Sequence, residues 1–324
     1  MVLPVLAETS SSSSSHWTCE TITIENIIAK RSNIIKSDQL EQGITEKVPW
    51  SGFWWPHQGY EGFPSLSDPG GVLEKFDSYA LQSLYSPSKA RERELELTSN
   101  SDYWEGYCTA WAAASILAEE PIARDRADSQ DSHPAPLSFD THELKGILTL
   151  LYAEPDMEIL AGRRCHSDEN ITSSECLDVA PCWLEYLLRE YILKQRRAII
   201  VDIHPFKPVF NFPLFAYSRS SFFEFDGDGA TEHVALVLWF VMAGRGGQAT
   251  TPSYDHSFDI TYSKDGKVKS CEWTYESINS HPDVVWIAHG RVPGGAENRN
   301  EHLKEEILME ILDTYSTTKR REHI

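Results

Sequence analysis

The stretch "SDYWEGYCTAWAAASILAEEP", residues 101–121, sets one cysteine between an aromatic approach and an alanine-rich run. Residues 110–119 predict a helix that Pro121 closes, because proline disfavours a helical residue before it. Cys108 then stands where a helix begins, and the free backbone N–H groups and helix dipole there favour a thiolate. The small side chains at positions 110 and 112–114 allow close packing on a sheet. The stretch therefore predicts a cysteine-bearing helix packed against a sheet.

The elements around this helix change type along the chain. Helical periodicity covers 140–153, with Asp140 as N-cap, and continues after Pro181. Strand patterns follow in "RAIIVDI", "EHVALVLWFVM", "SFDITYS", "KVKSCEW" and "DVVWIA", and Asp265-Gly266 predicts a hairpin turn. We therefore predict an α+β fold. A flexible leader at 1–45 precedes one domain at 46–324, with a helical half at 46–197, an antiparallel sheet half at 198–290 and a final helix at 298–316.

The composition limits the kinds of partner that the protein can bind. The 324 residues carry a net charge of −20, which argues against a nucleic-acid partner. The longest apolar run, "VALVLWFVMA" at 234–243, is too short to span a bilayer, so we expect no membrane partner. Residues 1–15 lack the basic region of a usual signal peptide, and the six cysteines form no CxxC pair. We expect a reducing, cytoplasmic setting.

No metal or other cofactor is expected from the sequence. The segment "DGDGATE" at 226–232 matches a calcium loop only in part, because it lacks the bidentate glutamate at the required position.

A nucleophilic cysteine needs a base, and the base needs an orienting partner. His233 opens the most apolar strand, and Asp259 lies on the next strand, facing back if the two pair. Three alternatives stay open: His256 with Glu272 or Asp255 as the acid, His281 in "HPD", and a purely structural role, which is common for a strand-end histidine and for a helix cysteine. His204, in "VDIHP", is interpreted as a loop histidine.

Tryptophans are concentrated in two segments, one at 50–56 and one around Cys108. They could line an acyl groove or anchor a loop by stacking; the tryptophans concerned are Trp54, Trp55, Trp104 and Trp111. The indole N–H of Trp104 is a candidate oxyanion donor. Asn211 could orient a substrate or an oxyanion, or it could have only a structural role in the turn where it lies.

Several motifs, in order over residues 50–287, resemble those of the oomycete and bacterial transglutaminase family, typified by the Phytophthora elicitor. They are "WSGFWWP" (50–56), "WEGYCTAWAAAS" (104–115), "DVAPCW" (178–183), "VFNFPL" (209–214), "DGKVKSCEW" (265–273) and "HPDVVW" (281–286). The chain departs from the family at Ala110, in "VFNFP" and in "SCEW".

The resemblance implies a papain-like or transglutaminase-like core, with Cys108, His233 and Asp259 as catalytic triad. It implies amide formation from an acyl donor and an amine acceptor through an acyl-thioenzyme. The donor would be a peptide glutamine or a small or carrier-bound acyl group, and the departures favour the latter, as in natural-product biosynthesis. A cysteine peptidase or amidase and a non-catalytic binding relative are the alternatives.

Overall fold

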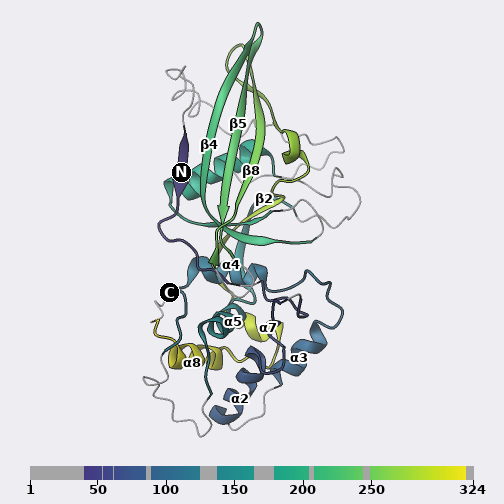
Figure 1. Cartoon of the computed structure of the whole chain (residues 1–324), viewed down its shortest axis with the longest axis vertical. Helices are drawn as coiled ribbons and strands as arrows, with labels where there is room; N and C mark the ends of the chain where they lie inside the picture. The colour runs from purple at the N-terminus through teal and green to yellow at the C-terminus, as the bar shows by residue number, and fades with distance from the viewer. Residues whose placement is uncertain are drawn as a thin grey trace.

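A computed structural model describes residues 40–52, 54–60, 62–84, 89–124, 137–163, 179–203, 208–243 and 249–318. Most of the helices gather at one end of the molecule, and the sheet extends from them as a long arm with a further helix beside it (Figure 1). Helix α4 (Cys108–Leu117) lies between the two parts. The predicted α+β class is confirmed.

The sheet has the strand order β2-β10-β3-β4-β5-β8-β9, and β1 pairs with β4. Its pairings are antiparallel throughout. The strands are β1 (Glu41–Ile44), β2 (Pro155–Gly162), β3 (Ile199–Asp202), β4 (Asn211–Asp226), β5 (Gly229–Phe240), β8 (Ser253–Ser263), β9 (Val268–Trp273) and β10 (Val284–Arg291). A separate pair joins β6 (Met242–Ala243) and β7 (Ala249–Thr250).

Alternation along β5 gives this strand one buried and one more open face. On β5, Val234, Leu236, Leu238 and Phe240 are buried. Side chains of alternate residues point to opposite faces of a strand. The residues between them, beginning with His233, therefore point to the open face.

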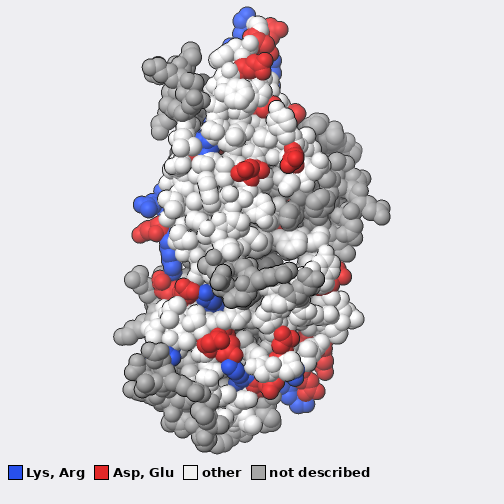
Figure 2. All heavy atoms as spheres, viewed as in Figure 1, with Lys and Arg blue, Asp and Glu red and all other residues white. Residues whose placement is uncertain are grey.

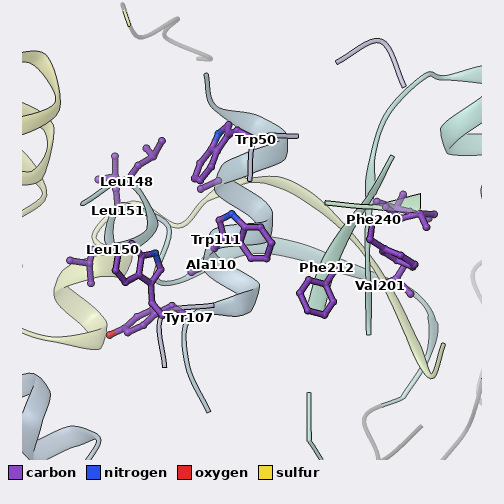
Figure 3. Close-up of a cluster of buried hydrophobic side chains, with 14 of the residues drawn as sticks. Trp50, Tyr107, Ala110, Trp111, Leu148, Leu150, Leu151, Val201, Phe212 and Phe240 are labelled. Atoms are coloured by element: carbon purple, nitrogen blue, oxygen red, sulfur yellow. The ribbon is translucent and has the colours of Figure 1, made fainter. Parts of the chain in front are cut away.

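Helix α4 is packed from both sides. Figure 3 shows Trp111 directed toward Phe212 of β4, while Leu148 and Leu151 of helix α5 lie on the other side of the helix. The rings of Trp111 and Phe212 meet edge to face, with centroids 6.1 Å apart. The alanines of α4 are buried, which lets the helix approach its neighbours closely.

The remaining helices lie partly around α5 and partly against the sheet. Asp140 caps α5 (Thr141–Leu151) in a capping box with Glu143, so the predicted N-cap is confirmed. The other helices are α2 (Val72–Leu84), α3 (Ala90–Leu97), α6 (Pro181–Leu187), the π-helical turn η3 (Leu188–Lys194), the 3₁₀ turn η5 (Tyr275–Ile278), α7 (Gly295–Arg299) and α8 (Glu305–Tyr315). The predicted C-terminal helix is thus two helices, α7 and α8.

Three strands (β1, β2 and β4) and a disulfide were not expected from the sequence. The segments 155–162 and 211–226 form β2 and β4, and β1 pairs with β4 although it falls within the predicted leader. Cys182 of α6 is bonded to Cys271 of β9 across 89 residues of sequence. Disulfides persist mainly in oxidising compartments, which argues against the reducing setting expected above. The expected leader over 1–39 and the cysteines at positions 19, 165 and 176 lie outside the described residues.

On the face drawn in Figure 2, lysine and arginine side chains are scattered among acidic ones, and much of the arm is uncharged. Within the described parts of the chain, no helix is long and apolar enough to cross a membrane.

Candidate functional site

Cys108 is the first residue of α4 and is 8% exposed. Its thiol approaches the backbone carbonyl of Val209, at 3.8 Å, and the hydroxyl of Thr109, at 3.9 Å. Cys182 and Cys271 are consumed in the disulfide, so Cys108 is the free thiol among the cysteines that the structure describes. The position at the helix start is the one predicted from the sequence.

Opposing effects act on the Cys108 thiol. Burial raises its pKa above the ordinary value, and the negative charge of Asp202 acts in the same direction. Backbone N–H groups of Asn211 and Thr109 and the Thr109 hydroxyl favour the thiolate. Burial prevails in the resting protein, so the thiol is protonated near neutral pH until a base removes its proton.

A chain of hydrogen bonds holds Thr109 in place. The indole N–H of Trp286 donates to Asn211 Oδ1 (3.0 Å), and Asn211 Nδ2 donates to Thr109 Oγ1 (2.7 Å). Because Thr109 Oγ1 accepts this bond, its proton remains available for the Cys108 sulfur. The Asn211 side chain, predicted to orient a substrate or an oxyanion, holds the residue beside the nucleophile through these bonds.

The Cys108 thiol opens on a cavity of about 260 Å³. Three of the four predicted tryptophans line it: Trp54, Trp104 and Trp111. The fourth, Trp55, is 1% exposed and packs on His142 with ring centroids 4.3 Å apart, away from the cavity lining.

A buried charge cluster supports the residue before Cys108. The Tyr107 hydroxyl donates to Glu94 Oε1 at 2.6 Å, and Arg299 Nη2 donates to the same oxygen at 3.2 Å. Asn300 Nδ2 donates to Glu94 Oε2 at 3.4 Å. Burial and the Glu94 charge raise the pKa of Tyr107, which therefore stays a hydroxyl donor. This cluster ties α3 and α7 to the start of α4, and the sequence contained no signal for it.

His233 and Asp259 face each other across β5 and β8, as the predicted strand order requires. His233 Nδ1 lies 2.8 Å from Asp259 Oδ1, and its Nε2 lies 3.3 Å from Glu224 Oε2. The His233 ring also stacks on Phe222.

The structure does not bring this pair to Cys108. Tyr254, which lines the cavity, is opposite Leu238, five residues along β5 from His233. Five residues of strand span about 17 Å. In addition, His233 and Asp259 point to the open face. Tyr254 alternates with them and lies on the same face of β8 as the buried His256 and Phe258. Proton transfer between Cys108 and His233 is therefore excluded in this arrangement.

The alternative histidines are buried beside Trp273. His256 is 6% exposed, with its ring centroid 5.7 Å from that of Trp273. His281 is 3% exposed, stacks on Trp273 at 5.2 Å, and its Nδ1 donates to the Ser277 carbonyl. The two alternative acids, Asp255 and Glu272, are exposed. Among the residues described, no histidine lines the Cys108 cavity; His204 lies outside them.

Asp202 is the acid that sequence reasoning missed. It ends β3 and is 1% exposed, and its Oδ1 accepts the Phe210 backbone N–H at 2.9 Å. Its charge acts on Cys108, and the next residue, Ile203, lines the cavity. The available signal was an aspartate closing the apolar run "AIIV", an unusual place for a charge.

His256 should make stability depend on pH. Burial and the neighbouring His281 lower the pKa of His256 from its ordinary 6.5 to about 4. The unfolded chain then binds more protons between these values, so the free energy of unfolding falls as pH drops from 6.5 to 4. We expect the loss over this window to be smaller in His256→Gln by on the order of 3 kcal/mol, as measured by urea unfolding. Equal losses in both proteins would contradict this.

Within the described ranges, no group of three or more His, Cys, Asp or Glu side chains could hold a metal ion. The "DGDG" of the partial calcium motif is the turn between β4 and β5, where Asp226 Oδ1 accepts the Asp228 N–H at 2.9 Å.

Comparisons with known proteins bear on the fold. No protein-family model matches the chain, and no curated protein matches it by sequence. The crystal structure of the GP42 transglutaminase from Phytophthora sojae is similar, with a TM-score of 0.54 and 16% sequence identity. The similarity covers 83% of this chain and 90% of that one. The chain therefore has a transglutaminase-like α+β fold.

Proposed function

We propose that the protein is a cysteine-dependent acyltransferase that forms amides through an acyl-thioenzyme on Cys108. The observation that carries the proposal is the Cys108 thiol itself. It begins a helix, where backbone N–H groups favour the thiolate, and it opens on an aromatic cavity within a transglutaminase-like fold. A merely packed cysteine needs none of these features.

The reaction follows ordinary thiol chemistry. A base takes the Cys108 proton, and the thiolate attacks the carbonyl carbon of R–CO–X, where X is an amide nitrogen or thioester sulfur. The C–S bond forms, the C–X bond breaks, and X leaves after taking up a proton. An amine then attacks the thioester, the C–N bond forms, the C–S bond breaks, and the proton lost by the amine nitrogen returns through the base to the Cys108 sulfur.

We assign the orienting carboxylate of this site to Asp202 rather than Asp259. A buried carboxylate near Cys108 stabilises the positive charge that develops on the base as it takes the thiol proton. The described residues supply the nucleophile, the carboxylate and the acyl cavity. They do not supply the base.

Amine dependence separates acyl transfer from hydrolysis. We expect the amide-to-acid product ratio to rise in proportion to amine concentration, because the apolar cavity excludes water from the thioester. The ratio is measured by chromatography after incubation with an acyl thioester and increasing amine, with Cys108→Ala as the control for uncatalysed aminolysis. A ratio insensitive to every amine tested would assign the protein to the peptidase or amidase class instead.

A further inference from the structure

The lining of the cavity beside Cys108 indicates which kind of acyl group it can hold. Its wall combines aromatic rings with aliphatic side chains, the latter being Ile203, Val209 and Met242. Among the described lining residues, none carries a charged side chain and Tyr254 is the one with a hydroxyl. From this wall we infer that the acyl group held on Cys108 is apolar, an arylalkanoyl or medium-chain alkanoyl group, and not the side chain of a peptide glutamine. The inference deepens the proposed function and depends on it for the covalent step.

Desolvation favours an apolar acyl group. Once a glutamine side chain is attached to the Cys108 sulfur, its two peptide groups follow within three carbons of the thioester carbonyl. Each peptide group placed in an apolar wall without a partner is costly to desolvate. An alkyl or phenyl group in the same place gains free energy by leaving water.

The size of the cavity sets an upper limit on the acyl group. A cavity of roughly 150 Å³ accommodates benzene in a protein interior. The Cys108 cavity, at about 260 Å³, has room for a phenyl ring and a linker of a few carbons to the sulfur. A 3-phenylpropanoyl group meets this description, and an acetyl group leaves most of the space unfilled.

The indole N–H groups of two tryptophans lie beside the cavity. The Nε1 atoms of Trp54 and Trp111 are buried and make no hydrogen bond to the described residues. Trp111 is 1% exposed, and a Cβ atom at Gly52 would overlap its Nε1, so the backbone at Gly52 packs directly on the indole edge. Because both Nε1 atoms are buried, neither offers the cavity an accessible donor for a peptide carbonyl.

Binding to Cys108→Ala tests the inference without chemistry. Two carboxamides share the reacting group and differ in the part that would enter the cavity: 3-phenylpropanamide and Nα-acetylglutamine methylamide. We expect 3-phenylpropanamide to quench tryptophan fluorescence with a Kd at least about tenfold lower than that of the glutamine compound. Equal affinities, or tighter binding of the glutamine compound, would overturn the inference whether or not Cys108 is catalytic.

A size series on the active protein tests the same cavity kinetically. With N-acetylcysteamine thioesters, kcat/KM for 3-phenylpropanoyl should exceed that for acetyl by about 10- to 100-fold. Met242→Trp should lower this ratio at least fivefold by filling the cavity, whereas Met309→Trp on α8, a half-buried methionine away from the cavity, should leave it unchanged. An unchanged ratio in Met242→Trp would overturn the inference. If no thioester is turned over but the apolar amide binds, the proposed function fails and the cavity assignment stands.

Discussion

Asp202→Asn is expected to lower acyl-transfer turnover about 100-fold or more, because an amide cannot stabilise the charge formed on the base. The substitution preserves shape, and the Asn oxygen can still accept the Phe210 N–H that now bonds to Asp202 Oδ1. The loss should therefore appear in kcat while the unfolding temperature changes little. Turnover is measured with a saturating thioester and amine.

The matched control for this prediction is His233→Ala, with Asp259→Asn beside it. Both residues lie on the open face of the arm, about 17 Å along the strands from Tyr254 at the cavity. We expect turnover within about threefold of the parent protein in each. An inactive His233→Ala variant together with an active Asp202→Asn variant would support the triad predicted from the sequence. It would also require a different arrangement of the arm.

Glu94→Gln is expected to lower the free energy of unfolding by about 3 kcal/mol. The carboxylate is 1% exposed and accepts hydrogen bonds from Tyr107, Arg299 and Asn300. Removing its charge leaves the Arg299 guanidinium beside a neutral group in a largely buried place. The measurement is urea unfolding at pH 7.

Two further variants isolate the cause of this loss. The double variant Glu94→Gln/Arg299→Gln should recover part of the stability, since it removes the uncompensated cation as well. Glu96→Gln, which breaks the exposed pair with Arg93 on the same helix, should leave the unfolding midpoint unchanged. A Glu94→Gln protein as stable as its parent would show that the cluster contributes nothing to the position of α4.

Local signals in the sequence predicted the elements whose structure is set locally. The cap at Asp140, the helix start at Cys108 and the turn at Gly266, with φ 79°, follow from nearby residues alone. Strand β4 was missed because Pro213 lies inside it and its motif "VFNFPL" was interpreted only through a family resemblance. Pro213 pairs with Ile200 of β3, and the pairing of β4 with β5 shifts register just after it, between Leu214 and Ala216.

The candidate site was predicted in part for a similar reason. Cys108, Trp104 and Trp111 are close in sequence, Trp54 comes from a second tryptophan-rich segment, and the structure places all four on one cavity. Trp286 reaches the site through the pairing of β10 with β3, which is distant in sequence, and the local signal for Asp202, an aspartate closing an apolar run, did not indicate which residues it would meet. The orientation of His233 was available, however: the buried positions 234, 236, 238 and 240 already place residue 233 on the opposite face.

Intact-mass spectrometry of the acyl-thioenzyme tests the central claim most directly. The protein is incubated with 3-phenylpropanoyl-N-acetylcysteamine without amine, quenched in acid and mapped by peptide digestion. The account predicts one added 3-phenylpropanoyl group on Cys108, its absence in Cys108→Ala, and its discharge to amide when amine is added before the quench. Acylation at another residue with Cys108 unmodified, or turnover that persists in Cys108→Ala, would contradict the account.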